Sequence, residues 1–235
     1  MSTDRVQRRL VAILAADVAG YSRLTDLDEE GTHRYLQDHL RSLVEPKIAE
    51  YRGRVVKNTG DGLLAEFSSV VNAVRCALDV QARMSERNAD VPPELRMEFR
   101  IGINLGDVII DRDDIFGDGV NVAARLEAIA YPGGICISEH AYQQVRGKLE
   151  FASEDIGEQK LKNISAPLRV YRVHPSEATT VIHPNLSLPD RPSIAALPFQ
   201  NMSGDPEQDY FADGIVEGIT IALSRFQHLF VIARS

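Results

Sequence analysis

The amino-acid sequence predicts an α+β fold, a sheet of strands with helices packed on one face. Short apolar runs of strand length alternate with longer segments in which apolar residues recur at helical spacing. Two pairs of neighbouring strand candidates are separated by glycine–aspartate turns, which are typical of hairpins. Hairpin-linked strands mixed with helices favour an α+β sheet. The hydrophobic content of 44% is ordinary for a globular protein.

The N-terminal segment predicts a strand followed by a helix. Residues 10–16 form an apolar run short enough for a buried strand. Asp17 follows directly, and Gly20 permits a turn. Residues 29–50 carry leucine and valine on one helical side, and Pro46 is expected to kink or shorten this helix.

A hairpin and a second long helix come next. Strands at 54–58 and 63–67 are joined by Thr-Gly-Asp-Gly, a hairpin turn in which glycine tolerates a positive φ. Ser68 or Ser69 caps a helix that continues to about residue 87, with apolar side chains on one face.

The remaining elements of this unit follow a break at Pro92 and Pro93. Two strands are expected on either side of the Gly106–Asp107 pair, and a helix is expected in the segment VNVAARLEAIA. The later candidates, in chain order, are a strand at 135–138, a helix at 139–147, and strands near 151–156 and 169–173.

The C-terminal part of the chain predicts a linker and an incomplete second domain. Residues 174–192 contain four prolines and little periodicity, which indicates a linker after a first domain at 8–173. Residues 193–235 have a strand–helix–strand pattern. Because so short a segment buries little core alone, we interpret it as a truncated domain or one that another chain completes.

Charge and composition exclude several classes of function. A net charge of −8 gives no electrostatic reason to expect binding to nucleic acid or to an anionic membrane. Cys76 and Cys136 lie far apart, which fits a reducing compartment and excludes a cysteine zinc site. The N-terminus is too polar for a signal peptide and no apolar run approaches membrane length, so a soluble, cytoplasmic protein is expected.

Two aspartates are candidate metal ligands. Asp17 ends the first strand, and Asp61 lies in a glycine-flanked turn where its carboxylate can point away from the sheet. Paired carboxylates without a histidine or cysteine partner favour magnesium or manganese over zinc. The alternative interpretation is that Asp17 caps a turn and Asp61 merely belongs to a hairpin, because short motifs alone do not identify a site.

A second candidate segment is DDIFGDGVNVAARLEAIA. Asn121 and Arg125 are four residues apart and share one face of the expected helix. The planar guanidinium of Arg125 suits phosphate or oxyanion charge. The alternative is a solvated arginine with Glu127 or Asp118 nearby.

These segments, taken together, resemble the catalytic domain of class III nucleotidyl cyclases, particularly bacterial adenylate cyclases. The resemblance covers residues from about 8 to 173. It rests on stretches that occur in the family order: AILAADVAGYSRL, GRVVKNTGDGLLAEF, RIGINLGDVI, DDIFGDGVNVAARLE, GGICIS and LKNISAPLRVYRV. It implies the nucleotide cyclase fold, a ferredoxin-like sheet with helices on one face, and an adenylate cyclase, a phosphorus–oxygen lyase.

The resemblance also implies a role for individual residues. Asp17 and Asp61 resemble the ligands of two divalent cations, Mg²⁺ or Mn²⁺, with the backbone carbonyl of Val18 as an additional ligand. The turn expected to wrap the triphosphate is made of Val18, Ala19, Gly20, Tyr21 and Ser22. Asn121 resembles the residue that orients the ribose, and Arg125 resembles the residue that stabilises the transition-state phosphate.

Substrate selection is implied by further positions. Lys57 and Asp114 resemble the pair that reads adenine, with Asp113 as the alternative to Asp114. Relatives specific for guanine typically carry glutamate and cysteine there, so the pair favours ATP. Lys162 resembles the lysine that contacts the terminal phosphates, with Lys160 as its alternative.

The active sites of this family form between two protomers, so the resemblance implies a homodimer that converts ATP to 3′,5′-cyclic AMP and pyrophosphate in signal transduction. Alternatives are a catalytically silent module that binds nucleotide or dimerises, and a guanylate cyclase. Residues 193–235 resemble the beginning of a TolB-like domain, which implies a regulatory partner.

Overall fold

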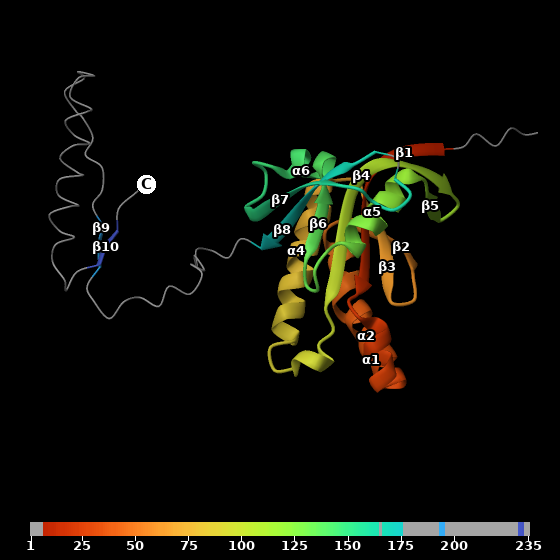
Figure 1. Cartoon of the computed structure of the whole chain (residues 1–235). Coiled ribbons are helices and arrows are strands. Elements are labelled where there is room, and N and C mark those ends of the chain that lie inside the picture. The colour runs from red at the N-terminus through yellow and green to blue at the C-terminus, as the bar shows by residue number, and fades with distance from the viewer. Residues whose placement is uncertain (1–6, 165, 176–192, 196–229, 233–235) are drawn as a thin grey trace, which may run out of the picture. The chain divides into compact units, whose positions relative to one another are not determined.

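The structure, a computed structural model, describes residues 7–164, 166–175, 193–195 and 230–232. The chain divides into two compact units, Met1–Thr179 and Thr180–Ser235. Figure 1 shows the larger unit as a curved sheet with helices against it.

The sheet of the larger unit has eight strands in the order β2-β3-β1-β4-β6-β8-β7, with β5 paired to β4. Neighbouring strands are antiparallel except β4 and β6, which are parallel. The strands are β1 (Gln7–Val18), β2 (Gly53–Asn58), β3 (Gly62–Phe67), β4 (Phe99–Asp111), β5 (Asp114–Phe116), β6 (Ile135–Ser138), β7 (Phe151–Gln159) and β8 (Leu168–Pro175).

Helical segments cover both faces of this sheet. They are α1 (Tyr21–Leu27), α2 (Glu29–His39), the π-helix η1 (Leu40–Val44), α3 (Glu45–Glu50), α4 (Val70–Arg87), the 3₁₀-helix η2 (Pro93–Leu95), α5 (Asp118–Ala128) and α6 (Glu139–Val145). One face packs against α1–α4, η1 and α6, which form the main core. The opposite face packs against α5, in a cluster that includes Ile115 of β5.

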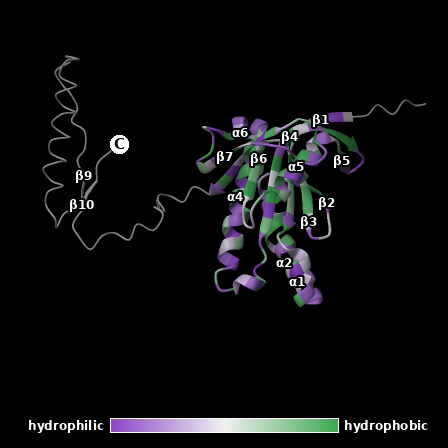
Figure 2. Cartoon of the chain, viewed as in Figure 1, coloured by the Kyte–Doolittle hydropathy of each residue, from purple (hydrophilic) through white to green (hydrophobic). Residues whose placement is uncertain are grey.

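The uninterrupted apolar run at residues 10–16 is explained by the position of β1 between two packed faces. Successive side chains of a strand point to opposite faces. Leu14 therefore belongs to the main core under the helices, while its neighbour Ile13 belongs to the cluster under α5. Both are at most 3% exposed. The central strands are accordingly largely green in Figure 2.

The predicted α+β fold class is confirmed, but the prediction that the helices pack on one face is wrong. Helix α5 lies on the opposite face, where alternate apolar side chains of β1 form a second cluster. The predicted helix at 29–50 contains a π-helical turn just before Pro46. This placement follows from the missing proline N–H, which cannot complete the preceding α-helical turn. Ser69, rather than Ser68, caps α4 by accepting a hydrogen bond from the amide of Asn72.

A second prediction was wrong, and three short elements, α1, β5 and η2, were not foreseen. The two strands expected around Gly106 are a single strand, β4, because Gly106 and Asp107 stay in register with Val11 and Leu10 of β1. Helix α1 and strand β5 are too short for periodicity to reveal.

The second unit is described at two short strands, β9 (Ser193–Ala195) and β10 (Phe230–Ile232), which pair in parallel. Both lie where strands were predicted. The helix expected between them and most of the expected linker at 174–192 lie outside the described residues. The proposed domain boundaries remain a prediction.

No helix in the described ranges combines the length and apolar character needed to cross a bilayer.

Candidate active site

Asp17 and Asp61 lie side by side at one end of the sheet. Asp17 of β1 pairs in register with Gly62, the first residue of β3. The amide of Val18 donates a hydrogen bond of 3.1 Å to the backbone oxygen of Asp61. The pairing of β1 with β3 therefore brings together the two aspartates predicted from separate motifs.

Arg100 of β4 binds the carboxylate of Asp17 with two nitrogens. The two residues are direct cross-strand partners. Arg100 Nε donates to Asp17 Oδ1 at 2.9 Å, and Nη2 pairs with Oδ2. The hydrogen bond to Asp17 raises the pKa of Arg100. Sequence analysis missed Arg100, although it is the one charged residue among residues 99–106, and a charge in so apolar a segment indicates a paired or functional group.

Glu127 of α5 adds a third carboxyl group to this cluster. Its Oε1 lies 3.9 Å from Nη2 of Arg100. Burial, followed by the hydrogen bond and charge of Asp17, raises the pKa of Glu127 to about 8. The helix comes so close because Gly102 of β4 has no side chain, and a Cβ there would overlap the backbones of Ala123 and Glu127.

The donor set of this cluster fits a hard divalent cation. Asp17 and Asp61 supply only oxygen, which Mg²⁺ and Mn²⁺ prefer. No group of three or more His, Cys, Asp or Glu side chains is arranged to hold a metal ion in the described part of the chain. Magnesium does not need such a group, because it is usually held by one or two carboxylates, waters and substrate phosphates. The aspartate pair is therefore compatible with metal binding that the substrate completes.

Lys57 and Asp114 form a second polar cluster. Lys57 Nζ lies 2.8 Å from Asp114 Oδ2 and 5.2 Å from the centre of the Phe116 ring. This hydrogen bond lowers the pKa of Asp114, whose other oxygen accepts the amide of Ile115 at 2.7 Å. Both side chains line an open cavity of about 420 Å³. Asp113 lines the same cavity, but its backbone oxygen accepts a hydrogen bond from Arg54.

Arg125 and Lys162 are brought together by a backbone contact. Arg125 Nε donates to the backbone oxygen of Lys162 at 3.1 Å. This hydrogen bond uses neither terminal nitrogen of the guanidinium. Asn121 lies one helical turn earlier on α5 and is exposed, as are the side chains of Lys162 and Lys160.

The turn from Val18 to Ser22 joins β1 to α1. Gly20 has φ 66° and ψ 33°, a left-handed conformation that glycine adopts without strain. The amide of Ala19 donates to the backbone oxygen of Glu98 at 2.8 Å, which ties the turn to the start of β4. Gly20 and Ser22 are exposed, whereas Val18 is buried.

Within the described residues, no hydrogen bond or ion pair connects the Asp17 cluster, the Lys57–Asp114 pair and the Arg125–Lys162 contact. The single chain therefore presents these predicted site residues as separate groups.

A mixed sheet with covering helices, an aspartate pair at one end of it and a separate lysine–aspartate pair define a protein of the nucleotide cyclase class. The chain belongs to the adenylate and guanylate cyclase catalytic domain family, whose model matches residues 5–175. Membership of this family implies a nucleotide substrate.

Curated relatives agree with this assignment. The chain is 47% identical over 240 residues to "Putative adenylate cyclase 3" of Rhizobium meliloti (strain 1021). This alignment covers 100% of this chain and 41% of that protein. It is 32% identical over 152 residues to an adenylate cyclase of Streptomyces coelicolor, covering 64% of this chain and 38% of that protein. The chain thus spans well under half the length of these relatives.

Solved structures show the same fold. An adenylate/guanylate cyclase/hydrolase from Silicibacter pomeroyi is 47% identical with a TM-score of 0.69, covering 73% of this chain and 99% of that one. The adenylyl cyclase CyaB from P. aeruginosa is 25% identical with a TM-score of 0.64, covering 74% of this chain and 98% of that one.

Proposed function

We propose that this chain is an adenylate cyclase that converts ATP to 3′,5′-cyclic AMP and pyrophosphate at a site formed between two copies of the chain. The observation that carries the proposal is the Lys57–Asp114 pair, which lines an open cavity on a domain of the cyclase family. The names of the Rhizobium and Streptomyces relatives favour the same substrate.

The lysine–aspartate pair matches adenine in its hydrogen-bonding pattern. A lysine ammonium only donates and an ionised aspartate only accepts. Adenine offers an accepting ring nitrogen next to a donating exocyclic amine. Guanine offers the reverse at those positions, a ring N–H next to a carbonyl oxygen, so donor would face donor and acceptor would face acceptor. A correctly read base edge contributes about 1–3 kcal/mol of discrimination.

The reaction is an in-line displacement at the α-phosphorus. The ribose 3′-oxygen forms a bond to that phosphorus, the bond to the β-phosphate oxygen breaks, and the hydroxyl proton leaves to solvent. Divalent cations held by Asp17, Asp61 and the Val18 carbonyl would supply activation of the hydroxyl and neutralisation of the leaving phosphates.

The remaining residues orient the substrate and stabilise charge. We assign Asn121 to the ribose and the terminal nitrogens of Arg125 to the charge that builds on the phosphoryl oxygens. The turn Val18–Ser22 and Lys162 are assigned to the triphosphate. Arg100 adds a positive charge to the Asp17 cluster. We assign it to balancing the charge of Asp17 or to binding a phosphate oxygen of the substrate.

Separate clusters within one chain support a two-chain site. A second copy that supplies Lys57, Asp114 and Arg125 opposite the aspartates of the first copy would complete two equivalent sites. Activity per protomer is then expected to fall on dilution below the dimer dissociation constant.

The deciding experiment measures cyclic nucleotide formed by purified protein with manganese and either ATP or GTP, across a range of protein concentrations. Cyclic AMP from ATP in preference to GTP is expected. Absence of product from both nucleotides at every concentration would instead identify a silent nucleotide-binding module, and preference for GTP would identify a guanylate cyclase.

A further inference from the structure

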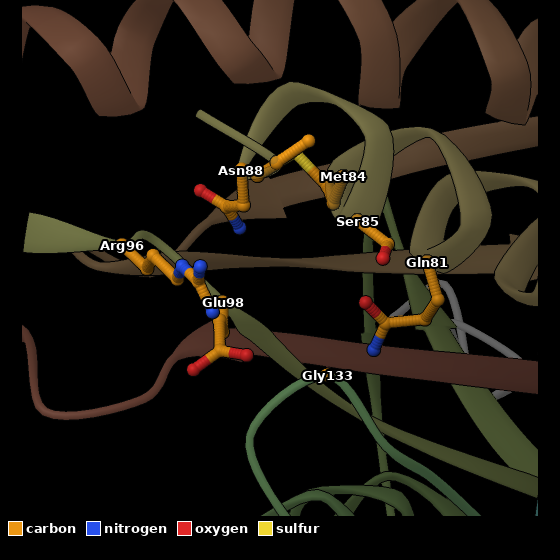
Figure 3. Close-up of a pocket in the computed structure, with 8 residues that line it drawn as sticks. Gln81, Met84, Ser85, Asn88, Arg96, Glu98 and Gly133 are labelled. Carbon is orange, nitrogen blue, oxygen red and sulfur yellow. The ribbon is translucent and has the colours of Figure 1, made fainter. Parts of the chain in front are cut away.

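A second cavity lies apart from all the predicted site residues. It has a volume of about 380 Å³ and lies between the C-terminal half of α4, the start of β4 and the loop before β6 (Figure 3). Its polar lining consists of Gln81, Ser85, Asn88, Arg96, Glu98 and the backbone at Gly133. The proposed cyclase reaction leaves this cavity without a role.

The Gln81 side chain presents a buried acceptor at this cavity. Its Nε2 donates to the backbone oxygens of Phe99 at 2.8 Å and Gly134 at 3.0 Å. Reversing the amide would set its oxygen against those two carbonyl oxygens, so the orientation is determined. Oε1 points away from Gly133 into the cavity (Figure 3). The residue is only 5% exposed, and Oε1 has no hydrogen-bond partner in the described part of the chain.

An unpartnered buried acceptor is costly and rare in folded proteins. One water molecule would satisfy it, but a water occupies only about 30 Å³ of liquid volume. The cavity has room for a small organic molecule as well.

Two opposite charges line the same cavity without neutralising each other. Arg96 Nε donates to the backbone oxygen of Val91 at 2.9 Å, a bond that uses neither terminal nitrogen of the guanidinium. Across residues 7–164 and 166–175, neither Arg96 nor Glu98 forms an ion pair. The cavity thus holds a cation, an anion and a fixed carbonyl acceptor.

The wall of this cavity also supports the candidate active site. The backbone oxygen of Glu98 accepts the amide of Ala19, in the turn assigned to the triphosphate. Phe99, whose oxygen Gln81 binds, pairs in register with Val18, and Arg100 follows it in β4. A molecule bound at Glu98 therefore contacts the residue that anchors this turn.

We infer that this cavity is a regulatory binding site for a small zwitterion with an ammonium and a carboxylate, as in a free amino acid. Glu98 and the Gln81 carbonyl hold the ammonium, and the terminal nitrogens of Arg96 hold the carboxylate. Charge-assisted hydrogen bonds at both ends select the doubly charged form.

Titration calorimetry of the whole chain tests the site, with the twenty standard amino acids as separate probes at up to about 10 mM, where millimolar affinities are measurable. At least one is expected to bind, while its methyl ester and its N-acetyl derivative are not. Glu98→Gln and Arg96→Gln each weaken binding by about tenfold or more. The matched control is Glu86→Gln, an exposed α4 glutamate outside the cavity lining.

Failure of all twenty probes to bind overturns the inference. The inference is also overturned if Glu98→Gln leaves the affinity for the amino acid unchanged, or if the methyl ester binds as tightly as the free amino acid. Because calorimetry needs no catalysis, these outcomes are independent of whether the chain is an active cyclase.

Hydrogen exchange tests the regulatory part. The bound amino acid is expected to slow exchange in the peptide containing Val18 to Ser22, through the Ala19–Glu98 hydrogen bond. Unchanged exchange there, with binding confirmed, overturns the coupling to the active site.

Discussion

The two polar clusters of the candidate active site differ in burial and in how their charges are balanced. In the first, the side chains of Asp17 and Arg100 are 14% and 28% exposed, and Glu127 makes the cluster rich in carboxyl groups. In the second, Lys57 and Asp114 are 42% and 34% exposed and form a simple pair. Desolvation strengthens charge interactions in the first cluster, whereas solvent screens those of the second.

This difference indicates different tasks. A crowded, partly buried carboxyl cluster is stable only if a cation balances it, as Arg100 does in this structure. An exposed pair contributes little to folding, which agrees with the role in base binding that we propose for Lys57 and Asp114. Changes in the first cluster should therefore abolish chemistry, and changes in the second should alter which base is accepted.

The largest effect is expected from the aspartates. Asp17→Asn and Asp61→Asn should each reduce cyclic AMP formation below detection with manganese, because a neutral amide is a poorer ligand for a hard cation. Circular dichroism and thermal unfolding check that each variant is folded. Substantial turnover by a folded Asp17→Asn variant would contradict the metal assignment.

Arg125→Ala should lower kcat by about 10²–10³ with little change in KM, because it removes a donor that acts on transition-state charge. The helix should remain intact, since Arg125 makes one exposed contact, to the Lys162 backbone. Steady-state kinetics with ATP measures both constants. A large rise in KM at unchanged kcat would instead assign Arg125 to ground-state binding.

The exposed pair should control specificity. Lys57→Ala should shrink the ATP preference over GTP by about 1–3 kcal/mol, the contribution of one correctly read base edge. Its effect on unfolding free energy should be at most about 1 kcal/mol, as for exposed ion pairs. Rates with both nucleotides and denaturation curves provide the comparison. Asp113→Asn is the matched control for Asp114→Asn, and an equal effect of the two would reopen the choice between them.

The smallest effect concerns pH and Glu127. Its pKa in the folded chain is raised to about 8 from an ordinary 4.5, chiefly by burial. Between these values the folded state holds a proton that the unfolded state has lost, so this group makes stability fall as pH rises from about 4.5 to 8. In denaturation experiments with a metal chelator present, Glu127→Gln should reduce the decrease of the unfolding free energy with pH. The control Glu158→Gln, at an exposed residue, should leave that decrease unchanged. An unchanged slope would contradict the raised pKa.

Periodicity and turn chemistry predicted most of the architecture. The apolar run of β1, the capped helix α4 and the hairpin of β2 and β3 follow local rules of burial, capping and glycine turns. Local rules did not predict that β4 continues through Gly106. Its continuity depends on pairing with β1, which is distant in sequence.

The candidate site also divides into features that the sequence predicted and features that depend on long-range contacts. The residue types of Asp17 and Asp61, with their places at a strand end and in a turn, sufficed to predict an oxygen-ligand pair. The base-reading role of Lys57 and Asp114 was predicted only from the resemblance to the cyclase family. The sequence could not show that Lys57 contacts Asp114, because their contact joins β2 to β5 across 57 positions of the chain.

By itself, the sequence determined the α+β class and the order of most elements, since these depend on local pattern. The candidate roles of most site residues came from the resemblance of its motifs to the cyclase family. Only the tertiary structure decided that Arg100 and Glu127 join Asp17, and that Gln81, Arg96 and Glu98 line a separate cavity. Such groupings depend on strand register and on the close approach of α5 at Gly102, which are set by long-range packing.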